Sequence, residues 1–278
     1  MFEYDEQTLK HLHEVQLMIL KDFIDLCEKN DLEYYAYGGT ALGAIRHNGF
    51  IPWDDDVDIL MFREDYEKFL KIMDESKSEK YEILNIDRTD DYLYMFSKLC
   101  LKETKFKSGW CLKKPFNVGI NIDIFVFDYI PSNRFIWFIF HKKFILLKKL
   151  ANLLDIIQND YYISNFKEKI GHTLKFMFGM LGITNTTFKK SYKKTLDKLH
   201  EKSDKNSLIY DIAAISYDKP FPKHVIYPPK KVKFESIEIN VPNDYDTYLK
   251  TNFGKYMELP PKEKRINHSP DILDFGKY

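Results

Sequence analysis

The sequence predicts an α/β (α+β) protein with a mixed-sheet core, a helical lobe and a C-terminal segment that packs back on the core. Three observations predict this architecture. Residues 1–130 alternate between helical and strand-like patterns, residues 131–205 are helical in pattern, and residues 206–278 return to short strands and turns. We therefore expect a core at 1–130, a helical lobe at 131–205 and an α/β segment at 206–278 that completes the site.

The core begins with an amphipathic helix over residues 7–29, whose apolar side chains recur at helical spacing. Residues 33–37 are rich in aromatic side chains and predict a short strand. Gly38 and Gly39 break this strand, and Thr40 is expected to cap a short helix because its side-chain oxygen can accept a free backbone N–H. The further elements are a strand at 56–61, a helix at 63–74, and strands at 81–86, 94–101 and 118–127.

The helical lobe contains an unusual segment at residues 135–150, FIWFIFHKKFILLKKL, which mixes bulky apolar residues with lysines. It predicts either an amphipathic helix on an anionic membrane surface or a helix whose apolar face packs on the core. A peripheral membrane contact of this kind would place the protein beside lipid-linked molecules. The longest apolar stretch, residues 135–140, is too short to span a bilayer.

Composition excludes several classes of protein. The 42 Lys and Arg residues balance 42 Asp and Glu residues, so the chain lacks the net basic charge that duplex DNA demands, and no nucleic acid is expected as a partner. Three scattered cysteines (Cys27, Cys100 and Cys111) predict neither a disulfide framework nor a zinc site. The polar, acidic N-terminus is not a secretory signal, so we expect a cytoplasmic protein, with the inner face of the membrane as a possible location.

The informative stretch is GGTALGAIRHNGFIPWDDDVDI, residues 38–59. Asp56 and Asp58 stand two residues apart at the start of a predicted strand, where their side chains point to one face. Two carboxylates on one face repel each other unless a cation lies between them, and oxygen ligands favour Mg²⁺ or Mn²⁺. The stretch therefore predicts a metal site, whereas Asp54 and Asp55 are expected to be solvated acids at a turn.

Glycines beside these acids predict a phosphate site. Gly38 and Gly39 lie between a strand and a helix, where a backbone without Cβ atoms can approach an anion and helix N–H groups point at it. The Thr40 hydroxyl could add a hydrogen bond. A third acid, Asp123, lies in the strand INIDIF with a parity opposite to that of its isoleucine neighbours. It is a candidate third metal ligand, or the group that orients the attacking hydroxyl.

Three cations are candidate partners for phosphate oxygens: Arg46, His47 and Lys98. For two of them the sequence leaves an alternative open. His47 could be a helix-end residue stabilised by the helix dipole. Lys98 could be an edge-strand lysine whose stem lies along apolar surface.

Three motifs together resemble the LicD family, whose eukaryotic relatives include the fukutin-type proteins. They are residues 38–59, NIDIFVFDYIP at 121–131 and YLKTNFGKYMELPPKEKRINH at 248–268. The resemblance implies the nucleotidyltransferase fold for the core. Matched by position, the resemblance implies that Asp56 and Asp58 are the paired acids and Asp123 the third acid. It also implies that Gly38, Gly39 and Thr40 form the loop on the phosphate side. His268 lies in the third motif and joins the candidate binding residues, although a solvated loop histidine is the alternative.

The resemblance also implies an activity, that of a cholinephosphotransferase of LicD type. Such an enzyme transfers a phospho-alcohol group, typically phosphocholine, from its CDP-activated form to a sugar hydroxyl of a cell-surface glycan precursor such as teichoic acid, lipopolysaccharide or a capsule repeat. Mg²⁺ or Mn²⁺ held by Asp56 and Asp58 would draw off charge as CMP leaves, and Asp123 would take the acceptor's proton. Two alternatives remain open: a nucleotidyltransferase that moves an NMP group, and a non-catalytic relative that binds a nucleotide or glycan.

Overall fold

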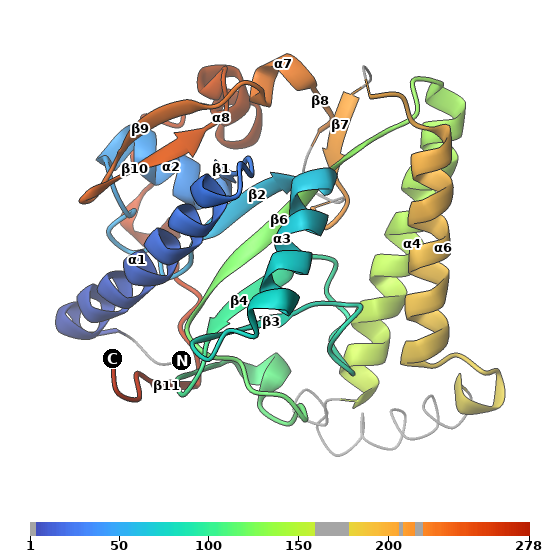
Figure 1. The fold of residues 1–278 in the computed structure, drawn as a ribbon, viewed down its shortest axis with the longest axis horizontal. Coiled ribbons are helices and arrows are strands. Elements are labelled where there is room, and N and C mark those ends of the chain that lie inside the picture. The colour runs from blue at the N-terminus through green and yellow to red at the C-terminus, as the bar shows by residue number, and fades with distance from the viewer. Residues whose placement is uncertain (1–3, 159–177, 206–207, 215–218) are drawn as a thin grey trace.

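The structure of the protein is a computed structural model that describes residues 4–158, 178–205, 208–214 and 219–278. Its helices are α1 (Glu6–Lys29), α2 (Gly38–His47), α3 (Arg63–Ser76), α4 (Arg134–Gln158), α6 (Asn185–Lys202), α7 (Lys223–Ile226) and α8 (Tyr245–Phe253). Its strands are β1 (Tyr35–Ala36), β2 (Asp58–Phe62), β3 (Tyr81–Leu84), β4 (Ser97–Leu101), β5 (Lys105–Lys107), β6 (Asn121–Tyr129), β7 (Leu208–Asp211), β8 (Phe221–Pro222), β9 (Lys230–Phe234), β10 (Ile237–Val241) and β11 (Ile272–Asp274). Figure 1 shows a central sheet with the α4–α6 pair on one side and α1 with the C-terminal elements on the other. The predicted α/β class with a mixed sheet is confirmed.

The main sheet is organised around β6. Strands β1, β2, β6, β4 and β3 follow one another across it, while β7 pairs with β6 and β8 with β7. β2 runs parallel to β6, whereas β4 and β7 pair antiparallel with the first and second parts of β6. In the parallel ladder Asp58 lies beside Asp123 and Phe62 beside Phe127. This register fixes which side chains meet at the amino ends of β2 and β6.

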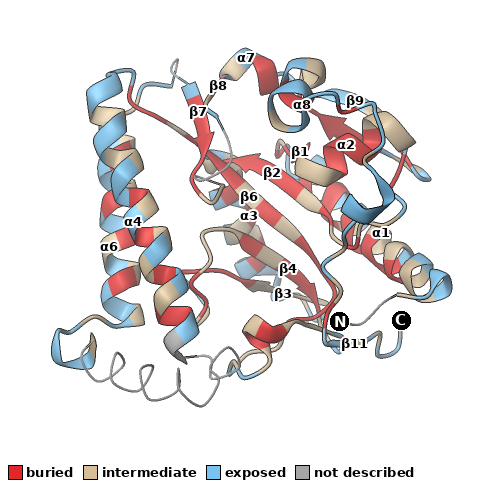
Figure 2. Cartoon of the chain, turned by 180° about the vertical axis from the view of Figure 1, so that it is seen from behind, coloured by how far each residue is buried: buried red, intermediate tan, exposed pale blue. Residues whose placement is uncertain are grey.

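One hydrophobic core joins the N-terminal helix, the sheet and the C-terminal segment. α1 contributes Leu12, Ile19 and Phe23, as the helical spacing of its apolar residues predicts. The β9–β10 pair and α8 contribute Phe234 and Tyr248 to the same core. Figure 2 shows the buried residues gathered along the sheet and on the inner faces of these helices. The expected packing of the C-terminal segment on the core is therefore confirmed.

The helical lobe has a core of its own. α4 and α6 pack together through Phe144, Phe188 and Leu199, and Tyr210 of β7 joins this cluster. The predicted helical pattern over 134–200 is confirmed at α4 and α6, and residues 159–177 lie outside the described residues. Within the described part of the chain, no helix combines the length and apolar character needed to cross a bilayer.

Some elements begin at residues other than those predicted. α2 starts at Gly38, because this glycine turns the chain out of β1 with a φ of +48°, so the prediction that Thr40 caps the helix is wrong. The Thr40 hydroxyl instead accepts a hydrogen bond from the Asp58 backbone N–H at 2.8 Å and joins α2 to β2. β2 starts at Asp58 rather than at residue 56, and β4 at Ser97 rather than at residue 94.

Asp128 on β6 ties the helical lobe to the core. Its carboxylate accepts two hydrogen bonds from the Arg63 guanidinium of α3, both at 2.8 Å, and lies 2.7 Å from Nε2 of His200 on α6. Burial alone would raise the pKa of Asp128, but the Arg63 charge and these hydrogen bonds outweigh it and hold the pKa below its ordinary value. The buried Asp128 carboxylate therefore links β6, α3 and α6.

We expect Asp128→Asn to destabilise the protein by about 3–5 kcal/mol at pH 7, because it leaves the largely buried Arg63 charge without its partner. Since the pKa of Asp128 is lower in the folded than in the unfolded state, its contribution is present above about pH 4 and is lost as the pH falls. Urea unfolding at neutral and acid pH measures the difference from wild type, which should shrink in acid. Lys250→Ala removes an exposed pair with Asp246 and should cost less than about 1 kcal/mol. Equal losses in both variants at pH 7 would contradict the role of Asp128.

Candidate active site

Two acids meet at the amino ends of β2 and β6. Asp58 and Asp123 are partners in the parallel ladder, so their side chains leave neighbouring strands on the same face, with backbones roughly 4.8 Å apart. The ladder extends one residue further, because the Asp123 backbone N–H donates to the Val57 carbonyl at 2.8 Å. Asp56 lies just before β2, and its charge interacts with both Asp58 and Asp123. The fold thus gathers three acids from two stretches of the chain.

Burial and mutual repulsion raise the pKa of these carboxyl groups. For Asp58 the largest cause is burial, followed by the charges of Asp56 and Asp123, and its pKa lies well above the ordinary value. Burial and then Asp123 raise the pKa of Asp56, and burial raises that of Asp123. For Asp54, burial followed by the charge of Asp56 raises the pKa to about 8. Carboxyl groups that repel each other in this way take up protons or a cation.

Lys98 supplies a positive charge to this group. Its Nζ donates to Asp123 Oδ1 at 2.6 Å and to Asn121 Oδ1 at 3.1 Å, and the side chains of Lys98 and Asp123 are each 14% exposed. Burial lowers the pKa of Lys98, but the Asp123 charge outweighs it and raises the pKa, so the ammonium stays protonated. β4 lies between β6 and β3, so the alternative of an edge-strand lysine is wrong.

Gly38 and Gly39 bring the start of α2 against the acids. A Cβ on Gly38 would stand 2.9 Å from Asp58 Oδ2, and one on Gly39 would stand 2.6 Å from Asp54 Oδ2. The Gly38 N–H donates to the Tyr248 hydroxyl at 3.0 Å. The partial positive charge at a helix start stabilises carboxylates that approach it. In this structure the absence of Cβ atoms at the two glycines lets the carboxylates of Asp58 and Asp54 approach closely. Contact of these glycines with a phosphate stays a prediction.

The expectation that Asp54 and Asp55 are solvated acids is wrong. Asp55 is buried, and its carboxylate accepts hydrogen bonds from the Tyr4 hydroxyl at 2.9 Å and the His268 backbone N–H at 2.7 Å. Its backbone carbonyl accepts one from the Gln16 side chain at 2.8 Å. Asp55 thus connects α1 and the C-terminal tail to the loop that carries Asp54, Asp55 and Asp56. A local acidic pattern could not reveal this burial, because the covering segments come from both ends of the chain.

Arg46 and His47 are not among the residues that line the small cavity beside Asp56 and Asp123. Arg46 donates from Nη1 to the Tyr256 carbonyl at 2.8 Å and from Nε to His47 Nε2 at 2.9 Å. Arg265 lies over the Trp53 ring, 4.7 Å from its centroid, and burial followed by the Arg265 charge lowers the pKa of Arg46. Arg46 is therefore bound to the C-terminal segment, and a contact of Arg46 or His47 with phosphate stays a prediction.

A cavity of about 190 Å³ opens beside Asp123. His268 stands at its rim, with Nδ1 3.8 Å from Asp56 Oδ2 and a side chain that is 76% exposed. The cavity is lined by Gln16, Asp55, Asp56, Lys98, Phe106, Ser108, Trp110, Val118, Asn121, Asp123 and His268.

Sequence reasoning missed several of these lining residues. Asn121 could have been found, because it shares the strand parity of Asp123. Gln16, Phe106 and Trp110 carried no such signal, because α1 and the segment after β4 reach the site only through the tertiary fold.

The oxygen atoms around the cavity fit a hard divalent cation. Gln16 is 2% exposed, and its Oε1 has no hydrogen-bond partner within the described part of the chain. This amide oxygen lines the same cavity as Asp56 and Asp123, and carboxylate and amide oxygens are ligands of such cations. No group of three or more His, Cys, Asp or Glu side chains among the described residues is already arranged to hold a metal. The acids would therefore have to adjust to bind one.

The site combines a mixed sheet, acids at the amino ends of two parallel strands and a Gly-Gly helix start beside these acids. A profile of the LicD/FKTN/FKRP nucleotidyltransferase domain matches residues 31–151. The chain is 28% identical to the lipopolysaccharide cholinephosphotransferase LicD of Haemophilus influenzae, over 94% of this chain and 96% of that protein. It is also 43% identical over 65 residues to an uncharacterized protein of Rickettsia typhi, which is 23% of this chain and 21% of the other. The profile match and this similarity support the resemblance to the LicD family that the motifs carry.

We expect Gly39→Ala to destabilise the protein by about 1 kcal/mol or more, because the new Cβ meets Asp54 Oδ2. In an Asp54→Ala background the same change should cost close to nothing, because the carboxylate is gone. Urea unfolding of the two single variants and the double variant measures this coupling. Gly179→Ala is the control, since a Cβ there has nothing within 4 Å. The contact is refuted by an equal cost of Gly39→Ala in both backgrounds.

Proposed function

We propose that this protein transfers phosphocholine from CDP-choline to a sugar hydroxyl of a cell-surface glycan precursor, in a reaction that needs Mg²⁺ or Mn²⁺. The observation that carries the proposal is the group of mutually repelling acids at the amino ends of β2 and β6, beside an amide oxygen without a partner. The Haemophilus influenzae relative is named a lipopolysaccharide cholinephosphotransferase, which supports the same class of reaction here. The cysteines are free and buried, which fits a reducing cytoplasm.

The proposed reaction makes one bond and breaks one. The acceptor oxygen attacks the phosphorus that carries choline, a new P–O bond forms, and CMP leaves with the electron pair of the bond that breaks. Asp56 and Asp58 would hold the divalent ion, which neutralises charge on the phosphoryl oxygens when it is bound. Asp123 takes the proton of the acceptor hydroxyl, because its raised pKa makes it a stronger base than an ordinary carboxylate. Lys98 orients Asp123 through the 2.6 Å hydrogen bond.

The donor diphosphate is assigned to the space between the start of α2 and the Lys98 ammonium. The first N–H groups of a helix have no partner within the helix, and the partial positive charge of the helix start favours an anion there. His268 at the rim can donate to the same oxygens when it is protonated. Arg46 already hydrogen-bonds to His47 through Nε and to the Tyr256 carbonyl through Nη1, so these two donors would have to exchange partners to reach the phosphate.

The small cavity offers a place for the quaternary ammonium of choline. Phe106 and Trp110 line it together with the carboxylates of Asp56 and Asp123. Aromatic faces and carboxylates attract a trimethylammonium group, which needs no hydrogen bonds. The lining therefore favours choline over an uncharged alcohol such as glycerol.

We expect Asp58→Asn and Asp56→Ala each to lower CMP release from CDP-choline by at least about 100-fold with little change in stability. Loss of a side chain that only orients a metal ligand already lowers activity by up to about 100-fold, so loss of a ligand itself should lower it at least as much. The measurement is CMP release in Mg²⁺, in EDTA, and after Mg²⁺ is restored. Asp25→Asn, an exposed acid of α1, is the matched control and should keep full activity.

The products of the same assay distinguish the proposal from its alternatives. CMP released together with a phosphocholine-bearing acceptor supports the proposal. Pyrophosphate released from a nucleoside triphosphate supports a nucleotidyltransferase, and binding of CDP-choline without turnover supports a non-catalytic relative. Full activity in either acid variant, or activity that EDTA leaves unchanged, rules out the proposed metal site.

We expect Trp110→Leu to raise KM for CDP-choline by about 3–30-fold, the range that a cation–π contact supplies. KM for CDP-glycerol should not change, because glycerol carries no positive charge. Trp110→Phe, which keeps an aromatic face, should restore most of the affinity for CDP-choline. Steady-state kinetics with both donors measure this selectivity. If both donors lose affinity equally, Trp110 only supports the local structure.

A further inference from the structure

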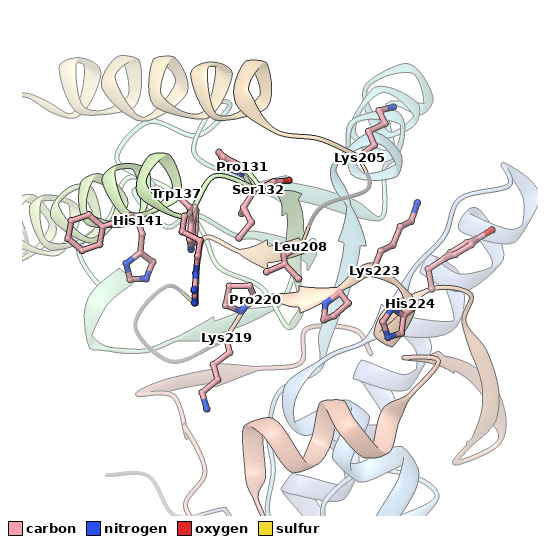
Figure 3. Close-up of a pocket in the computed structure, with 15 residues that line it drawn as sticks. Pro131, Ser132, Trp137, His141, Lys205, Leu208, Lys219, Pro220, Lys223 and His224 are labelled. Carbon is pink, nitrogen blue, oxygen red and sulfur yellow. The ribbon is translucent and has the colours of Figure 1, made fainter.

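A second cavity, of about 1040 Å³, lies at the opposite end of β6 from the acids, between the start of α4 and α7. Figure 3 shows its labelled lysines around it: Lys205, Lys219 and Lys223. Among the described residues that line it, Arg134 is a fourth cation, two are histidines and none is Asp or Glu. Lys205 pairs with Glu64, whereas Arg134 and Lys219 make no ion pair with any described residue. The positive charges of Arg134 and Lys219 at this cavity are therefore not paired with any acid in the described part of the chain.

The helix that forms one wall of this cavity also leaves an apolar stripe uncovered. On α4, Phe135 and Leu146 are 72% and 66% exposed, and Phe138 and Ile139 are exposed as well. These four residues, the α4 stripe, lie on the side of the helix away from Phe144, which packs against α6. Phe138 belongs both to the stripe and to the cavity lining, so the two features form one continuous surface.

The charges along the α4 stripe indicate what covers it. Lys142 and Lys149 are exposed beside it, and Lys142 Nζ lies 5.4 Å from the centroid of the Phe138 ring. Asp155, the one acid in the sequence of α4, is buried in an ion pair with Lys114. A second copy docked about a two-fold axis would set these lysines against each other. Lipid phosphates match them, because apolar side chains enter the headgroup layer while lysines meet the anionic surface.

We infer that this protein binds an anionic membrane surface through α4, with the α4 stripe in the headgroup layer and the basic cavity around a lipid phosphate. The apolar stripe and the basic cavity provide the two signals that stable peripheral binding requires. The inference is independent of the reaction proposed above, since vesicle binding can be measured without any turnover.

Flotation of the full-length protein with vesicles tests the inference. We expect the protein to float with vesicles that contain phosphatidylglycerol and to stay behind with vesicles of phosphatidylcholine alone. Phe135→Ser with Leu146→Ser should abolish flotation, and Lys142→Gln with Lys149→Gln should weaken binding by about 30-fold. Arg134→Gln with Lys219→Gln tests the cavity and should weaken binding to a similar extent. The matched control is Lys10→Gln with Lys21→Gln, two exposed lysines of α1, which should bind like wild type.

Four outcomes would overturn the inference. With the wild type, these are no flotation with either kind of vesicle and equal flotation with both kinds. With the variants, they are an α1 control that weakens binding as much as the α4 variants do, and an Arg134/Lys219 variant that binds as well as wild type. A concentration-dependent dimer in solution that Leu146→Ser abolishes would also overturn it, in favour of self-association. Thermal unfolding of every variant confirms that the fold is retained, which the exposure of these side chains leads us to expect.

Discussion

The parallel ladder between β2 and β6 holds two carboxylates side by side, and the rest of the site depends on this constraint. The acids cannot relieve their repulsion by a slip of the strands, because both faces of β2 are packed and a slip of one residue would exchange the side chains on them. Ile59, Leu60 and Met61 are almost fully buried, and each contributes about 1.5–3 kcal/mol by that burial. Apolar burial thus fixes the register, and the register forces Asp58 against Asp123.

The groups around the acids can be understood as responses to this repulsion. Lys98 binds Asp123, and the positive start of α2 approaches Asp58 because Gly38 has no Cβ. Segments near both ends of the chain close over Asp55, because the Tyr4 hydroxyl and the His268 backbone N–H both donate to its carboxylate. The C-terminal tail is therefore part of the site, since His268 reaches the acids from it.

The sequence predicted those parts of the site that depend on local periodicity. The parity of Asp123 within INIDIF was enough to separate it from the core isoleucines, and its partner in the ladder is Asp58. Asp54 and Asp55 were misjudged, because their burial depends on α2 and on segments far away in sequence. The start of α2 was missed for a similar reason: Thr40 has the chemistry of a cap, but the φ of Gly38 decides where the helix begins. Trp110 gave no signal, because its position beside the acids depends on long-range packing.

The two binding features of the molecule lie at opposite ends of one strand. Asp123 is near the start of β6, and Ile130, just beyond its end, lines the basic cavity. Seven residues of extended chain separate them by about 23 Å. A protein held on a membrane by α4 would carry its acids at that distance from the basic cavity rather than among the headgroups around it. A sugar attached directly to a lipid headgroup would then lie too close to the bilayer to reach Asp123. If the proposed reaction and the proposed membrane contact both hold, the length of the acceptor glycan, as well as its chemistry, would decide which hydroxyl is reached.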